Sequence, residues 1–292
     1  MKRPRYIDIH AHTNFVAFDA DRDHVIRRAL DSGTWMINVG TKADTSRRAV
    51  EIAEKYGEGV YAIVGLHPIH VNPSHHDSDE SGAEGRVVET TGEDFDPSFY
   101  RDLVRQGGGA VVGIGECGLD YFRPLTTEER DRQVSAFRAQ IELALELDLP
   151  LMLHIRSGEG QSAYRDALDI LKGYKVYARD KLRGDAHFFA GSLAEAREFV
   201  DLGFYLSFTG VITFAPSYRE LVRNVPHDRI MSETDCPYVA PVPHRGKRCE
   251  PVFVQEVAHT IAALQDVPID RCLESLVDNA HRLFRLDRRH IA

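Results

Sequence analysis

Short apolar runs rich in β-branched residues alternate with longer amphipathic stretches along the whole chain. This alternation constrains the fold more than any other feature, because it is typical of parallel strands joined by crossover helices. We expect eight strands, at residues 5–10, 35–40, 60–66, 110–116, 150–155, 184–189, 204–208 and 229–234. Eight strands, each followed by a helix, predict an α/β protein with a closed (β/α)8 TIM barrel. A doubly wound open sheet is the alternative, but it usually has fewer strands and a glycine-rich phosphate loop after the first one.

The helical pattern is clearest at residues 126–147, where Thr126 and Glu129 predict a capping box at the helix start. The apolar stripe of this helix consists of Val134, Phe137, Ile141 and Leu145. From residue 251 onward the sequence predicts three further helical segments, at about 251–265, 270–277 and 279–286. We interpret them as the last crossover helix and a C-terminal helical extension. We therefore expect residues 1–292 to form a single barrel domain.

The charge of the chain is concentrated in one segment. With 36 basic and 45 acidic residues, the net charge of −9 argues against a protein that coats nucleic acid through a broad basic surface. Residues 75–96 hold eight of the acids against Arg86 alone, a local charge of −7. This stretch is rich in Gly and Ser and has no apolar periodicity, so it predicts a long surface loop or a partly disordered insertion. If it folded over the active rim, it would repel long nucleic acids.

The cellular compartment is indicated by what the sequence lacks. Its four cysteines show no CxxC pairing, and no apolar run is long enough for a membrane-spanning helix. The N-terminal residues reach Asp8 and His10 before any apolar stretch suited to a secretory signal. We expect a cytoplasmic protein with no membrane partner; the oligomeric state stays open.

Potential metal ligands stand at the ends of several predicted strands. In a barrel these ends share one rim, so side chains far apart in sequence converge there. His10 and His12 are two residues apart on an extended segment and point to the same face. Imidazole and carboxylate ligands suit Zn²⁺, Mn²⁺, Fe²⁺ or Mg²⁺. The candidates on the rim are His10, His12, His67, Glu116, His154, His187 and Asp235. Glu116, on the fourth strand, is the natural bridge between two metals.

These residues lie in motifs that resemble the TatD-type metal-dependent hydrolases, the TatD deoxyribonuclease family of amidohydrolase-like barrels. The motifs are DIHAH (8–12), GLHP (65–68), GIGECGLDY (113–121), HIR (154–156), HFFAG (187–191), SETDCPY (232–238), HRGKRCEP (244–251) and NAHRLF (279–284). They span nearly the whole chain in the order that the family has.

The resemblance implies a cofactor of two divalent ions per chain, such as Mg²⁺, Mn²⁺ or Zn²⁺. One ion would be bound by His10, His12 and Asp235, the other by His154 and His187, with Glu116 bridging both. The resemblance also implies hydrolysis of phosphodiesters, typically DNA trimmed from its 3′ end, so DNA or another phosphodiester is the expected partner.

The chemistry can be argued from the residues themselves. Two cations about 3.5–4 Å apart stabilise both oxygens of an in-line displacement and lower the pKa of a shared water. Asp235 is the candidate that orients or deprotonates this water. The negative charge that develops on phosphorus needs positive partners, and His67, Arg156 and the cluster at 244–248, with Arg245, are the local candidates. The cluster is equally well explained as a solvated surface loop.

Four further positions add detail. Glu233 is two residues before Asp235 and either holds a histidine ligand or forms an ordinary buried ion pair. Cys117 and Cys236 directly follow proposed ligands, and adjacent strand residues face opposite ways, so we expect them to pack beside the site. Cys249 stands where the family generally has Asn, which alters a loop contact.

Two other classes of function stay open. A metal-activated water also attacks carbonyl carbon, so the protein could be an acyl or amide hydrolase, such as a deacylase of aminoacylated RNA. A barrel that binds metal without turnover is the other alternative, but the intact ligand set argues against it.

Overall fold

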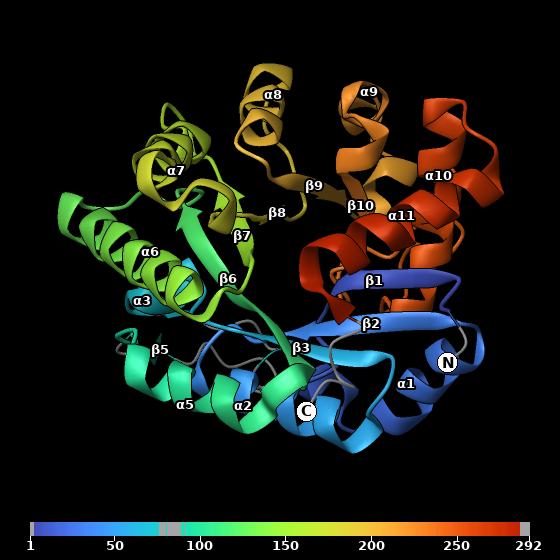
Figure 1. Ribbon diagram of the computed structural model, residues 1–292, viewed down its shortest axis with the longest axis horizontal. Helices are drawn as coiled ribbons and strands as arrows, with labels where there is room; N and C mark the ends of the chain where they lie inside the picture. The colour runs from blue at the N-terminus through green and yellow to red at the C-terminus, as the bar shows by residue number, and fades with distance from the viewer. Residues whose placement is uncertain (1–2, 76–79, 81–88, 91, 287–292) are drawn as a thin grey trace.

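The computed structural model describes residues 3–75, 80, 89–90 and 92–286. Eight parallel strands form one nearly closed barrel in the order β1-β2-β3-β6-β7-β8-β9-β10, with the helices outside it (Figure 1). The strands are β1 Tyr6–Ala11, β2 Thr34–Val39, β3 Val60–Val64, β6 Val111–Asp120, β7 Leu151–Arg156, β8 Gly184–Ala186, β9 Tyr205–Phe208 and β10 Ile230–Ser232. The TIM-barrel prediction is confirmed, and each expected strand overlaps one of these.

Helices follow the strands and cover the outside of the barrel. Their bounds are α1 Arg22–Asp31, α2 Ala43–Tyr56, α3 Pro68–Val71, α5 Pro97–Gly107, α6 Thr127–Leu147, α7 Ala163–Ala178, α8 Leu193–Asp201, α9 Pro216–Asn224, α10 Val254–Gln265 and α11 Ile269–Phe284. The predicted capping box of α6 is present: Thr126 caps the Glu129 N–H, and the Glu129 carboxylate accepts from the Thr126 N–H at 2.8 Å. No helix among these described residues is long and apolar enough to cross a membrane.

The prediction for the C-terminal region is wrong in one respect. The segments expected at 270–277 and 279–286 are a single helix, α11. Asn279 does not interrupt it, because its side-chain amide donates to the carbonyl oxygens of His227 (3.0 Å) and Ile230 (2.9 Å). Asn279 is thus a tertiary anchor of α11.

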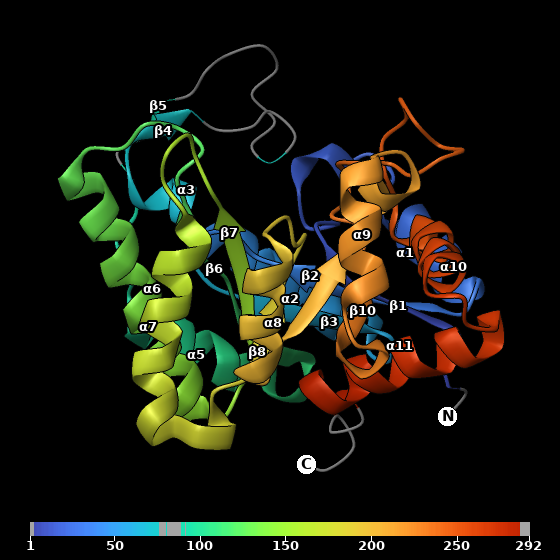
Figure 2. The same ribbon diagram turned by 90° about the horizontal axis from the view of Figure 1, so that it is seen from above.

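The strands bury side chains on both faces. One apolar cluster joins the strands to the surrounding helices. A second cluster takes residues from strands around the barrel, from Ile7 and Ile9 of β1 to Met231 of β10, and packs them against Leu283 and Phe284 of α11. Figure 2 shows α11 below the strands, at the end opposite β4 (Ser74–His75) and β5 (Glu89–Thr90).

The barrel closes between its first and last strands. The Asp235 N–H donates to the carbonyl oxygen of His10, and the His12 N–H donates to that of Cys236, both at 2.9 Å. Inside this closure the buried carboxylate of Asp8 accepts from the backbone N–H and the hydroxyl of Thr234. The register of β1 shifts between Asp8 and Ala11. Such an irregularity re-aims the side chains that follow it, and here it precedes the His10–His12 pair.

The acidic segment is only partly described. Most of it, residues 76–79, 81–88 and 91, lies outside the described residues, so its expected disorder stays a prediction. Its ends pair as the short antiparallel strands β4 and β5. Glu80 is buried, where it accepts from the Thr41 hydroxyl and lies 3.1 Å from His70 Nε2. Glu93 accepts from the N–H of Ala43. The segment is therefore tied to the barrel at two carboxylates and is not wholly a solvated loop.

Candidate metal centre

The structure brings the predicted ligands together at the carboxyl ends of the strands. Each comes from a different part of the chain: His10 and His12 from the end of β1, His67 after β3, Glu116 from β6, His154 from β7, His187 after β8 and Asp235 after β10. Their ligand atoms fall into three overlapping groups, each with all atoms within 4.8 Å of one another: His10, Glu116 and His187; His10, His12 and Asp235; His67, Glu116 and His154.

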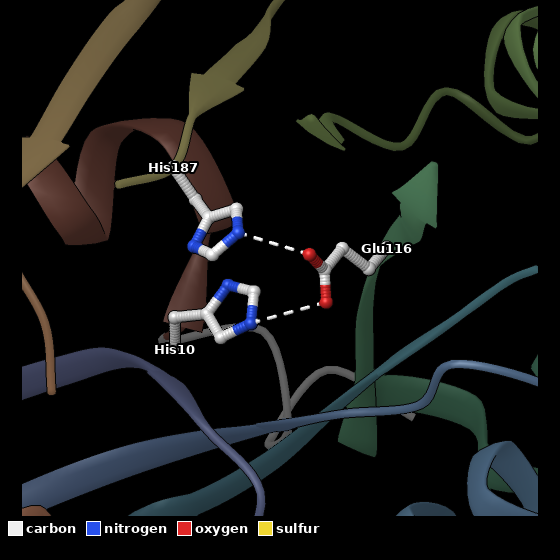
Figure 3. Close-up of side chains that lie close together, drawn as sticks. All are labelled: His10, Glu116 and His187. Atoms are coloured by element: carbon white, nitrogen blue, oxygen red, sulfur yellow. Dashed lines mark ion pairs between the residues drawn. The ribbon is translucent and has the colours of Figure 1, made fainter. Parts of the chain in front are cut away.

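Glu116 stands between two sets of imidazoles. Its Oε1 lies 2.8 Å from His154 Nδ1 and 2.9 Å from His187 Nε2. Its Oε2 lies 3.4 Å from His10 Nε2, and Figure 3 shows the two oxygens facing His187 and His10 separately. A carboxylate whose two oxygens address two different ligand sets is suited to bridge two cations.

The backbone of β6 permits this arrangement at a glycine. Gly118 has a φ of +143°, and a Cβ there would lie 2.1 Å from the carbonyl oxygen of His154. Only glycine lets β6 pass this close to β7, and this closeness holds Glu116 and His154 in contact.

The ring of His12 is oriented so that its Nε2 faces the other candidate ligands. Its Nδ1 lies 2.8 Å from the carbonyl oxygen of Val39, which can only accept, so Nδ1 carries the proton. In the neutral ring Nε2 is then free of a proton, and it faces His10 Nε2 at 3.0 Å and Asp235 Oδ1 at 3.4 Å. Nitrogen and carboxylate atoms that converge at these distances can share one cation. The donor set therefore fits a divalent metal ion.

A second layer of groups holds the imidazoles from behind. Glu233 is fully buried; its Oε2 lies 3.4 Å from His187 Nδ1 and 3.8 Å from His10 Nδ1, and its Oε1 accepts from the Phe188 N–H. Carboxylates in this position fix the ring orientation of metal-ligating histidines. The sequence left two roles open for Glu233. The geometry matches the role of orienting histidine ligands.

Sequence reasoning missed Asp120. Its Oδ2 lies 3.0 Å from His154 Nε2, so His154 stands between Asp120 and Glu116. The residue is part of the GIGECGLDY motif and lies four positions after Glu116 on β6. Because i and i+4 share one face of a strand, the spacing was a usable signal.

The charges in this buried cluster depend on one another. Burial alone would raise the pKa of Glu116, but the charges of His67, His187 and His10 hold it well below its usual value. Burial would lower the pKa of His187, but the charges of Glu116 and Glu233 raise it well above its usual value. The centre thus keeps its carboxylates ionised, as metal ligands must be.

His67 is oriented as a hydrogen-bond donor. Its Nδ1 accepts from the N–H of Ile69 at 3.1 Å, so the neutral ring carries its proton on Nε2, which faces Glu116 Oε1 at 3.4 Å. Burial lowers the pKa of His67 to about 4, which keeps the ring neutral. In this tautomer a bare nitrogen is therefore not presented to a metal, and the substrate-binding role of His67 stays a prediction.

The predicted basic residues Arg156 and Arg245, and Arg248 beside them, differ in the groups that they contact. Arg156 follows His154 by two positions, and its guanidinium carbon lies 3.6 Å from the ring centroid of Phe122. Arg245 lies 3.7 Å from the Phe214 centroid, and no described hydrogen bond or ion pair connects it to the histidine cluster. Arg248, of the same 244–248 cluster, pairs with Asp21 at 2.7 Å. Because Asp21 already neutralises the charge of Arg248, this residue of the cluster stabilises the fold.

The cysteines near the site are buried thiols. Cys117 Sγ lies 3.7 Å from the carbonyl oxygen of Met152, and burial raises the pKa of Cys117 far above its usual value. Cys236 and Cys249 are also fully buried and unpaired. None of the three is a member of the ligand groups found among the described residues.

Comparisons with known proteins agree with this geometry. The TatD related DNase family matches residues 7–285. The uncharacterized metal-dependent hydrolase YabD of Bacillus subtilis is 36% identical over 283 residues, which cover 96% of this chain and 99% of YabD. The 3′-5′ ssDNA/RNA exonuclease TatD of Erwinia amylovora is 31% identical over 287 residues, with 96% and 99% covered. The crystal structure of YjjV, a TatD homolog from Escherichia coli K12, has a TM-score of 0.80 at 27% identity and covers 97% of this chain and 99% of its own.

Proposed function

This chain belongs to the TatD-related DNase family of metal-dependent hydrolases, and we propose that it is a two-metal phosphodiesterase that trims single-stranded nucleic acid from the 3′ end. The observation that carries the proposal is the position of Glu116, whose two oxygens face separate sets of imidazoles. The exonuclease activity of the Erwinia relative supports the choice of substrate. We propose that residues 1–292 act as one catalytic unit.

We propose two ion sites, as the family resemblance implies. His10, His12 and Asp235, which form one of the three ligand groups, would hold one ion. His154 and His187, which both lie beside Glu116 Oε1, would hold the other, with Glu116 shared. Two divalent cations supply electrophilic stabilisation of the charge that develops at phosphorus, and they lower the pKa of a water molecule. Nitrogen and carboxylate donors are compatible with Mg²⁺, Mn²⁺ or Zn²⁺.

The protein side chains would do the rest of the chemistry. Asp235 would orient the attacking water, because its carboxylate lies beside His12. Burial would raise the pKa of Asp235, but the His12 hydrogen bond lowers it, so the carboxylate stays ionised and free to accept the proton of the water. His67 would donate its Nε2–H to a phosphate oxygen. Arg156, exposed at the end of β7, would pair with the phosphate charge from the solvent side. Four unpaired cysteines support a reducing, cytoplasmic compartment.

The test is hydrolysis of a 3′-labelled single strand and of a small chromogenic phosphodiester, each with Mg²⁺, Mn²⁺, Zn²⁺ or chelator. We expect metal-dependent stepwise shortening that chelator abolishes. If the metal-bound protein hydrolysed neither substrate, the result would contradict the proposal and favour carbonyl hydrolysis.

Replacing the bridging carboxylate tests the two-metal assignment. Glu116→Gln removes the charge at constant volume, so we expect it to lower metal content and to reduce turnover by at least about a hundredfold, the scale of losing one preorganised charge-stabilising group. The matched control is Glu128→Gln on the exposed face of α6, which should behave as wild type. Metal analysis and circular dichroism accompany the rates, and unchanged turnover with Glu116→Gln contradicts the assignment.

A further inference from the structure

An exposed phenyl ring stands beside the metal centre. Phe122 directly follows the GIGECGLDY motif and is 57% exposed. Arg156 covers one face of the ring, with its guanidinium carbon 3.6 Å from the centroid. Single exposed hydrophobic residues are common, so the exposure needs a second observation before it carries any meaning.

The second observation is the connection between this ring and the centre. The Asp120 carboxylate accepts from the Phe122 N–H at 2.9 Å through Oδ1, and its Oδ2 lies 3.0 Å from His154 Nε2. One carboxylate thus fixes both the backbone of Phe122 and a candidate metal ligand. Arg156 follows His154 by two positions on β7, so both point to the same face of the strand.

Other aromatic groups stand on the neighbouring part of the rim. Phe188 directly follows His187, and its ring lies 6.2 Å from that of Tyr218 on α9. Burial raises the pKa of Tyr218, and the positive charge of Arg156 opposes that rise. The two side chains therefore interact electrostatically.

This set of groups has the chemistry that binds an unpaired nucleotide. A base stacks on an aromatic face whatever its identity, and a neighbouring arginine pairs with the phosphate. The cation over one face of Phe122 holds the ring in place, so little side-chain freedom is lost when a base stacks on the open face. Bases in a duplex are stacked and paired, and they cannot offer such a face to a protein.

We propose that Phe122 and Arg156 form a nucleobase subsite, in which Phe122 stacks a base of the single-stranded substrate and Arg156 pairs with an adjoining phosphate. The inference rests on the proposed function and names the group of the substrate that is recognised. It also assigns the preference for single strands to a particular side chain.

The experiment compares two single-stranded oligonucleotides of equal length, one normal and one with abasic residues at its last three 3′ positions. For Phe122→Ala we expect kcat/KM on the normal strand to fall by about tenfold more than on the abasic strand, the scale of one lost base–aromatic stack. Phe122→Trp should restore most of the difference. The matched control is Tyr177→Ala, an equally exposed aromatic at the far end of α7.

Binding without turnover gives an independent readout. Fluorescence anisotropy of both strands in chelator should show weaker binding of the normal strand by Phe122→Ala and no added loss on the abasic strand. Equal losses on both strands, in rates and in binding, would overturn the subsite and leave the phosphodiesterase proposal intact. A wild-type enzyme that cleaves neither strand with metal bound would instead overturn the phosphodiesterase proposal.

Discussion

At the scale of single residues, the centre depends on backbone and side-chain groups that would not touch a metal themselves. Val39 fixes the proton of His12 through its carbonyl oxygen, Glu233 lies behind His10 and His187, and Asp120 lies behind His154. Each acceptor lies beside one ring nitrogen, so that the other nitrogen faces the centre. The orientation of the ligands is therefore a property of this second layer.

Asp120→Asn tests that layer. The amide keeps the size of the side chain and an acceptor for the Phe122 N–H, but it removes the charge beside His154 Nε2. Outer-shell substitutions of this kind typically cost about 10- to 100-fold in metal affinity or activity, and we expect that range here. Chelator competition measures the affinity, with Asp131→Asn on the exposed face of α6 as control. Equal metal affinity in the two variants would show that Asp120 does not position His154.

At the scale of elements, the acidic segment is held by one buried contact. Glu80 is 6% exposed and touches Thr41 and His70, which lie after β2 and in α3. Burial would raise the pKa of Glu80, but hydrogen bonds from His70 and Thr41 and the charge of His70 outweigh it and lower the pKa to about 2. A lowered carboxyl pKa means that the ionised form stabilises the fold.

The sign of this linkage gives a pH dependence. The contribution of Glu80 is fully present above its usual pKa of 4.5 and is lost as the pH falls through the folded value of about 2. We expect Glu80→Gln to lower the free energy of unfolding by roughly 1.5–3 kcal/mol near pH 6, and the difference from wild type to shrink steadily below pH 4.5. Urea unfolding from pH 6 to pH 3 measures it, beside the exposed Glu58→Gln as control. A difference that does not change with pH would contradict the ionised buried contact.

At the scale of the whole molecule, barrel closure and the candidate metal centre share the same residues. His10 and Asp235, from the two ends of the barrel sequence, are joined by a backbone hydrogen bond at the seam. Directly below, Asp8 and Thr234 are both fully buried, and the Asp8 carboxylate has Thr234 as its hydroxyl donor. The first and last strands of the barrel must therefore pair at this seam before His10 and Asp235 can come together.

Thr234→Val probes the seam. Valine matches the shape of threonine but leaves a buried Asp8 oxygen without its hydroxyl partner, which costs about 1–3 kcal/mol of unfolding free energy. Thr234→Ser keeps the hydroxyl and should cost less than about 1.5 kcal/mol, as expected for one lost methyl. Denaturant unfolding of the three proteins checks the order. If Thr234→Val and Thr234→Ser lost the same stability, the hydroxyl would not contribute to closure.

The sequence by itself determined the eight strands, the capped α6 helix and the positions of the ligand candidates. Those features follow from local periodicity and from the rule that parallel strands end on one rim. Only the tertiary structure decided which oxygen of Glu116 faces which imidazole, where Glu80 lies, and that Arg248 is neutralised by Asp21. It also decided that α11 continues through Asn279. These features depend on contacts between residues far apart in the chain, whose partners no local pattern specifies.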